Sequence, residues 1–175
     1  MKKLTLLVAF VAAIGIVNAQ SDYKQAIGIR VSPASNYDLA AASFKTFLSE
    51  AGAIELNAGF GGDRYYDIPG DNYRTNSVSF TGAYQHHFDI QPVDGLKWYI
   101  GGGATVFHTA SSNKNKAYRG TGFGLFPTGG ADYKFKSIPL NVSADWRPTF
   151  LVARPERGWN NFLGEQFGVS ARYTF

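Results

Sequence analysis

The stretch "QFGVSARYTF", residues 166–175, alternates apolar residues with small or polar ones up to its last position. The apolar phase consists of Phe167, Val169, Ala171, Tyr173 and Phe175. Successive side chains of a β-strand point to opposite faces, so a period of two indicates a strand with one apolar face. We therefore predict that a strand occupies the final residues and ends on Phe175.

The same period of two recurs along most of the chain. It is clear in "VSFTGAYQHHFDI", residues 78–90, and in "PLNVSADWRPTF", residues 139–150. Counting such segments predicts eight strands, at 25–31, 41–48, 53–60, 77–90, 96–107, 122–135, 139–151 and 163–175.

The connections between these strands alternate in length. Three are short and rich in turn-forming residues: "SEAG" at 49–52, "QPVDG" at 91–95 and "KSIP" at 136–139. The other four are longer and polar, at 32–38, 61–76, 108–120 and 153–162. Strict alternation of turns and loops is typical of an up-and-down antiparallel barrel with one short-turn rim.

The first residues have the form of a secretory signal. Lys2 and Lys3 precede a mostly apolar run from Leu4 to Val17, and the small residue Ala19 offers a cleavage point. We expect a signal peptide at 1–19, which is removed, and a barrel domain at 20–175. The apolar run is shorter than the roughly 20 residues that a transmembrane helix needs.

Composition excludes several classes of protein. The chain has no cysteine, so it has no disulfide framework. Without Lys2 and Lys3 the 17 basic residues become 15, against 13 acidic ones, a net charge of +2. These basic residues are scattered rather than clustered, so we expect no nucleic-acid partner. We also expect no cofactor and no metal.

The polar phase of the strands carries charges of both signs. A soluble carrier barrel of the lipocalin type has an apolar lumen, whereas a membrane barrel has a polar lumen and an apolar outside. Mixed charges fit a narrow lumen, because a charge removed from bulk water needs a partner. The predicted lumen charge network is Arg30, Lys45, Glu55, Asp89, Asp132, Lys134, Asp145, Arg147 and Arg172.

Aromatic residues of the apolar phase gather near the strand ends. Near the short turns they are Phe88, Trp98, Tyr133, Phe135, Tyr173 and Phe175. Near the long loops they are Tyr37, Phe60, Phe123, Phe150 and Phe167, while Trp146 lies nearer the middle. Two aromatic belts around an aliphatic waist match the two interfaces of a bilayer.

A signal peptide, alternating strands and the ending "RYTF" together resemble the small outer-membrane barrels of Gram-negative bacteria. The similarity is to the OmpA/OmpX-like eight-stranded superfamily and rests on pattern rather than on a diagnostic motif. It implies that Ala171, Tyr173 and Phe175 form the C-terminal signal read by the barrel assembly machinery. It also implies contact with outer-membrane lipid and lipopolysaccharide, and termini in the periplasm.

Some eight-stranded outer-membrane barrels modify lipid A with a histidine, a serine and an acid near the outer rim. Here His108 is followed by Ser111 and Ser112, but no acid stands nearby and the H-x-S spacing of the deacylases is absent. His86 and His87 are adjacent in one strand and must face opposite sides, so they cannot chelate one metal. We expect His87 to lie in the lumen near Asp89.

The sequence therefore predicts an all-β protein: an eight-stranded antiparallel transmembrane barrel with a structural or surface-interaction role and no catalysis. We expect its charges to plug the lumen, and its outer loops to offer a surface for an extracellular ligand. Three alternatives remain at this stage: a small channel, a lipid A-modifying enzyme and a soluble lipocalin-like carrier.

Overall fold

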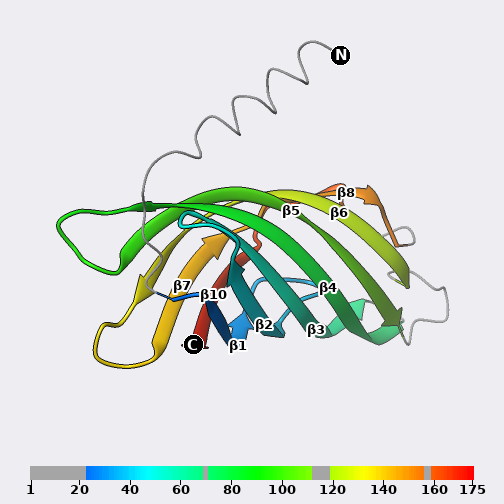
Figure 1. Ribbon diagram of the computed structural model, residues 1–175. Helices are drawn as coiled ribbons and strands as arrows, with labels where there is room; N and C mark the ends of the chain where they lie inside the picture. Colours follow the sequence, from blue (N-terminus) through cyan, green and yellow to red (C-terminus); the bar gives the residue numbers. More distant parts are fainter. Residues whose placement is uncertain (1–22, 69–70, 112–118, 156–158) are drawn as a thin grey trace, which may run out of the picture.

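A computed structural model describes residues 23–68, 71–111, 119–155 and 159–175, with backbone alone for 62–68, 71–74 and 111 (Figure 1). The expected signal peptide at 1–19 lies outside these residues. The strands are β1 (Gln25–Val31), β2 (Ala40–Phe47), β3 (Gly52–Ile68), β4 (Asp71–Asp89), β5 (Leu96–Ser111), β6 (Gly120–Lys134), β7 (Leu140–Trp146), β8 (Thr149–Ala153), β9 (Phe162–Leu163) and β10 (Phe167–Thr174).

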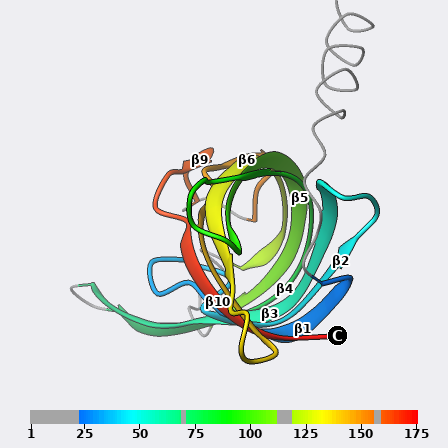
Figure 2. The same cartoon turned by 60° about the vertical axis from the view of Figure 1, so that its left-hand side comes forward.

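These strands form one closed, antiparallel, up-and-down barrel, as the view in Figure 2 shows. Chain neighbours pair in order from β1 to β6, β5 pairs with β6, and β10 pairs with both β1 and β7. Because β8 continues β7 and β9 leads into β10, the wall has eight strands. The predicted all-β, eight-stranded barrel is confirmed at this level.

The last residue belongs to the wall. The amide of Phe175 donates to the carbonyl of Gln25 at 2.9 Å, and the amide of Gln25 donates back at 3.0 Å. The ladder between β1 and β10 runs from Ala26 opposite Thr174 to Val31 opposite Val169. This seam joins the two ends of the described chain and removes the free edges that an open sheet would have.

One long connection differs from the prediction. The segment 61–76 was expected to be a polar loop, but β3 and β4 continue through it as a hairpin, pairing up to Ile68 opposite Asp71. A register shift at Asp63/Arg64 marks a bulge in this extension. The period of two could not predict it, since a ribbon beyond the barrel has no face to bury and needs no alternation.

The predicted strand at 139–151 is interrupted between β7 and β8. The register on either side, Gly129 opposite Trp146 and Leu125 opposite Phe150, sets Pro127 opposite Pro148. Neither proline has an N–H group, so this pair cannot exchange ladder hydrogen bonds. Arg147 still donates its amide to the carbonyl of Gln166 at 2.9 Å, which keeps the chain in the wall.

The two faces of the wall differ in polarity in the direction that the charge pattern predicts. In β10 exposed and buried residues alternate without a break from Phe167 to Thr174. Large apolar side chains lie on the outer face; Ile29 is 61% exposed, Val169 61% and Phe80 53%. The interior is lined mainly by charged and polar side chains.

Candidate functional site: the lumen and its turn-side rim

Glu55 on β3 is the centre of the lumen network. Its carboxylate accepts hydrogen bonds from Arg147 Nη2 at 2.6 Å and from Gln85 Nε2 at 2.8 Å, and Arg172 Nη2 lies at 3.0 Å. All of these groups are at least nine-tenths buried. A carboxylate held by two guanidinium groups has the paired surroundings that a buried charge requires.

A second group lies around Arg30 on β1. Its Nη2 is 2.6 Å from Asp145 Oδ1, and its Nη1 is 3.3 Å from Asp38 Oδ2. Asp145 also meets Arg147 Nε at 2.9 Å, which links this group to Glu55. Gly168 makes room for the guanidinium, because a Cβ at that position would lie 2.2 Å from Arg30 Nη2.

A third group surrounds Asp132 on β6. Its Oδ2 lies 2.5 Å from Lys45 Nζ, and its Oδ1 accepts from Asn141 Nδ2 at 2.5 Å. His87 Nε2 is 3.4 Å from Lys45 Nζ, as suits an acceptor nitrogen, and 3.8 Å from Asp132. His87 therefore lies in the lumen, as its phase in the strand predicts, but beside Asp132 rather than Asp89.

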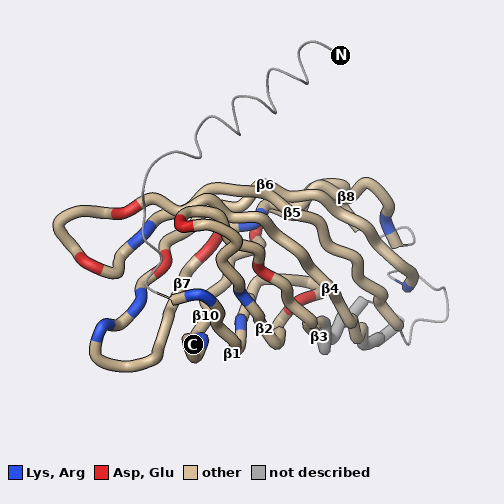
Figure 3. The backbone as a smooth tube through the Cα atoms, in the orientation of Figure 1, with Lys and Arg blue, Asp and Glu red and all other residues tan. Residues whose placement is uncertain are grey.

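The charges of these groups balance. Four cations (Arg30, Lys45, Arg147, Arg172) meet four carboxylates (Asp38, Glu55, Asp132, Asp145), all buried. Asp38 is the member that sequence reasoning missed. It lies in the 32–39 connection, outside the strands, where burial raises the pKa of its carboxyl and Arg30 acts in the opposite direction. In Figure 3, basic (blue) and acidic (red) positions both occur along the strands of the barrel wall.

Two residues of the predicted network lie elsewhere. Asp89 is exposed at the end of β4 and pairs with Lys97 at 2.7 Å. Lys134 is half-buried at the end of β6 and donates to the carbonyl oxygens of Phe135 and Ile138. Both residues have the strand phase of the lumen face. Strand phase does not show how far along the barrel axis a residue lies, however, and both lie at the turn-side rim, outside the buried charge network.

The loop end of the lumen is closed by apolar side chains. Tyr37 stacks on Phe107 with ring centroids 4.4 Å apart, and Phe107 contacts Trp159 at 5.0 Å. Leu151 and Leu163 complete this apolar cluster. Tyr37 was expected in the outer aromatic belt, and that expectation is wrong. The 32–39 connection turns inward and the Tyr37 hydroxyl pairs with Thr149 Oγ1 at 3.2 Å.

The turn-side aromatic residues lie in pairs on the outer face. Phe88 and Trp98 stack at 4.4 Å, and Tyr133 meets Phe135 edge to face at 4.7 Å. Tyr173 and Phe175, both more than half exposed, lie 6.4 Å apart. Ala171, the third residue of the expected assembly signal, is also exposed.

His108 does not show a catalytic arrangement in the described residues. It is exposed on the outer face, and its Nδ1 lies 2.9 Å from Thr121 Oγ1. The side chains of Ser111 and Ser112 lie outside the described residues. Within the described part of the chain, no group of three or more histidine or acidic side chains could hold a metal ion.

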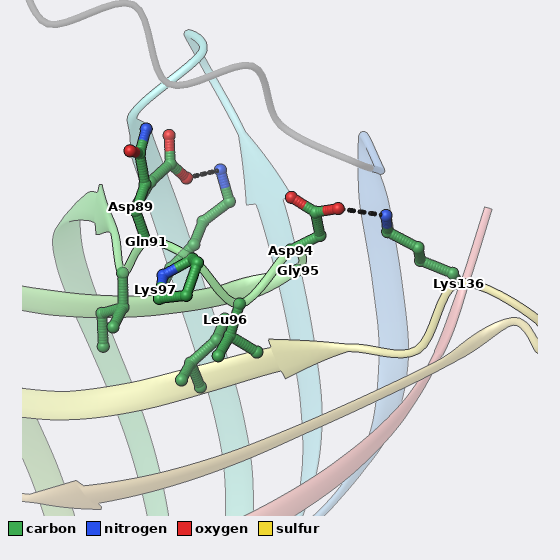
Figure 4. A pocket seen from close by; sticks show the side chains of 10 residues that line it. Asp89, Gln91, Asp94, Gly95, Leu96, Lys97 and Lys136 are labelled. Carbon is green, nitrogen blue, oxygen red and sulfur yellow. Dashed lines mark hydrogen bonds and ion pairs between the residues drawn. The ribbon is translucent and has the colours of Figure 1, made fainter.

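A pocket of about 670 Å³ opens at the turn-side rim, between the connection after β4 and the connection after β6 (Figure 4). Two ion pairs line it: Asp89 with Lys97 at 2.7 Å, and Asp94 with Lys136 at 2.5 Å. The hydrogen bond from Lys136 lowers the pKa of the exposed Asp94 carboxyl. Gln91 and Leu96 add an amide and an apolar side chain to the lining.

Comparison with known proteins adds no relative. No family model matches the chain, and no curated protein matches it. In the described residues, no helix has the length and apolar character needed to cross a membrane. Function must therefore be argued from the geometry.

Proposed function

We propose that this chain is an integral outer-membrane β-barrel protein with a plugged lumen and a structural or surface-interaction role. One observation carries the proposal: the closed barrel buries charges and exposes large apolar side chains. Glu55 and Lys45 are 0% exposed, whereas Phe60 is 63% and Val152 67% exposed. A barrel in lipid has this polarity, because its outer face contacts hydrocarbon and its lumen does not.

The lipocalin-like alternative requires the reverse. A carrier of apolar ligands would line its lumen with apolar side chains along its length, whereas here the middle of the lumen is filled by Glu55, Arg147 and Arg172. An eight-stranded barrel is just wide enough for its own side chains to fill it. The same filling argues against an open channel, since Arg147 contacts Glu55 directly.

The lengths of the connections support a proposed orientation in the membrane. In membrane barrels of this kind the short turns face the periplasm and the longer loops face outward. The described ends of the chain, Tyr23 and Phe175, lie at the short-turn rim. We therefore propose periplasmic termini, assembly by the barrel assembly machinery, and outer-leaflet lipopolysaccharide around the loop end. The extended β3–β4 hairpin then lies on the extracellular side, where it offers a surface for a ligand.

The test is heat-modifiable mobility on SDS gels, with boiled and unboiled outer-membrane fractions. A folded membrane barrel migrates differently before boiling. We expect such a shift, and we expect it to be strongly reduced when Phe175 is deleted, because that deletion removes the last wall pairing with Gln25. A protein found in the soluble periplasmic fraction without any shift would refute the proposal.

A further inference from the structure

The connection after β4 contains the pair Asp94–Gly95, and the sequence has no other aspartate or asparagine followed by glycine. The amide of Leu96 donates to the carbonyl of Val93 at 3.2 Å, and Gly95 has a φ of 82°. This combination is typical of a type II turn, whose third residue requires a positive φ and favours glycine. A Cβ at Gly95 would also lie 2.4 Å from the carbonyl oxygen of Lys134. The turn therefore needs a glycine directly after Asp94.

That glycine leaves the peptide unit after Asp94 accessible. The Asp94 side chain is 76% exposed, and glycine has no side chain to cover its own amide nitrogen. Among the described residues, neither the Gly95 amide nor the Asp94 carbonyl takes part in a hydrogen bond. The peptide unit can therefore rotate without losing a hydrogen bond of its own. Rotation brings the Gly95 nitrogen to the carboxyl carbon of Asp94, where ring closure gives a succinimide.

Lys136 acts against this ring closure. Its Nζ lies 2.5 Å from Asp94 Oδ2 (Figure 4). The carboxyl group reacts in its protonated form, because its oxygen leaves as water, whereas a carboxylate oxygen is a poor leaving group. The contact with Lys136 lowers the pKa of Asp94 and so favours the unreactive form. Both side chains are largely exposed, and exposed ion pairs are weak, so this protection is only partial.

We propose that Asp94 converts spontaneously to isoaspartate in the folded protein, at a rate that its ion pair with Lys136 lowers. The Gly95 nitrogen bonds to Asp94 Cγ, the Cγ–O bond breaks, and the oxygen leaves as water with the amide proton. Water then adds to the backbone carbonyl carbon of the succinimide, and the bond from that carbon to the Gly95 nitrogen breaks. The chain now runs through Cβ and Cγ, and the former backbone carbonyl becomes the free carboxylate.

The experiment uses the folded protein, purified from the cell fraction that contains it and incubated at mildly acidic pH beside the same chain unfolded in guanidinium chloride. Trypsin releases the peptide 75–97, which holds Asp94 and also Asp89 as an internal control. Electron-transfer dissociation identifies isoaspartate, because its Cα–Cβ bond lies in the backbone and gives its own fragment ions. We expect isoaspartate at Asp94 and none at Asp89, where the branched side chain of Ile90 shields the next amide.

We expect the rate in the folded protein to lie within about tenfold of the unfolded rate, the largest factor that the one turn hydrogen bond from Leu96 to Val93 contributes. Isoaspartate that forms in the unfolded chain but not in the folded protein would overturn the proposal, because the turn would then hold the peptide unit fixed. This test does not depend on the membrane location. Gel mobility of the same samples therefore tests the proposed function separately.

A pair of lysine variants tests the ion pair. Lys136→Gln should raise the rate at Asp94 about twofold, the factor that an exposed ion pair contributes. Lys24→Gln removes the same charge at another exposed position and is the matched control, which should keep the wild-type rate. An equal rate in the two variants would overturn the protective role of Lys136.

Discussion

The middle and the loop end of the lumen are closed by different interactions, ion pairs in the middle and aromatic packing at the loop end. In the middle, buried ion pairs join Glu55, Arg147 and Arg172 at 2.6 to 3.0 Å. At the loop end, Tyr37 and Phe107 stack with no charge between them. Both regions lie inside one wall, although Tyr37 enters from the connection before β2. Within the strands the alternation decides which side chains enter the lumen, and the residue type decides how they close it.

This difference matters for how each region fails. A buried ion pair that loses one partner leaves an uncompensated charge, which costs more than the pair itself contributes. An aromatic cluster that loses one ring leaves a cavity, whose cost depends on how far its neighbours can move. The charged middle should therefore be intolerant of single changes, and the apolar end should respond in proportion to the volume removed.

The largest effect is expected for Glu55→Gln. The change removes the charge that both Arg147 and Arg172 face, so we expect the free energy of unfolding to fall by about 3–5 kcal/mol. Urea titration of the refolded protein in detergent, followed by tryptophan emission, measures it. Glu50→Gln, at an exposed site, is the control and should have almost no effect. Equal stability of the two variants would show that the middle of the lumen does not depend on its charges.

Phe107→Ala tests the apolar end. Phe107 is 1% exposed and contacts both Tyr37 and Trp159, so we expect a loss of about 3 kcal/mol from the cavity and the lost stacking. The emission of Trp159 should also move to longer wavelength as water enters. Phe80→Ala, on the outer face, serves as the control. An unchanged Trp159 environment would mean that the cluster does not close the loop end.

Two glycine substitutions compare the regions directly. A Cβ at Gly122 would lie 2.3 Å from the ring of Phe107, and one at Gly168 would lie 2.2 Å from the guanidinium of Arg30. The ring sits in a packed cluster, and the arginine can move only by giving up its buried pairing with Asp145. We expect Gly122→Ala to cost about 1–3 kcal/mol and Gly168→Ala to cost more, because a displaced Arg30 leaves a buried carboxylate uncompensated.

The control is Gly82→Ala, where the nearest side-chain atom would be Leu56 Cδ2 at 3.5 Å, an ordinary contact. Unfolding titrations of the three variants under one condition give the order. A smaller loss at Gly168 than at Gly122 would contradict the comparison, because it would show that the charged middle tolerates a single change better than the apolar end.

Strand phase made much of this arrangement predictable. Glu55, Asp145 and Arg172 share the inward phase of their strands, and the closed wall buries all three. The same rule could have found Tyr99 and Phe107, since they share the phase of Lys97 in β5. Neither residue was named in the prediction, because the predicted lumen network consists of charged residues only.

Phase could not predict the contributions of the connections. Tyr37 and Asp38 enter the lumen from the segment before β2, where no periodicity applies. Strand phase also does not show the position of a residue along the barrel axis, which is why Asp89 and Lys134 were grouped with the buried charges. Height depends on barrel tilt and on where each strand begins, and these are properties of the closed sheet rather than of any one segment.

The smallest effect is expected for Asp94→Asn, which shows how much an ion pair contributes when water reaches it. Lys136 lowers the pKa of Asp94, so the pair stabilises the folded state above the ordinary aspartate pKa of about 3.9 and is lost as pH falls through the lower folded value. The thermal midpoints of wild type and variant should therefore differ slightly but constantly from pH 5 to 8, and should converge in stronger acid.

Because both side chains are exposed, 0.5 M salt should also remove the difference, whereas it should leave the effect of Glu55→Gln almost unchanged. A salt-resistant effect at Asp94 would contradict the distinction between exposed and buried pairs on which the account of the lumen depends.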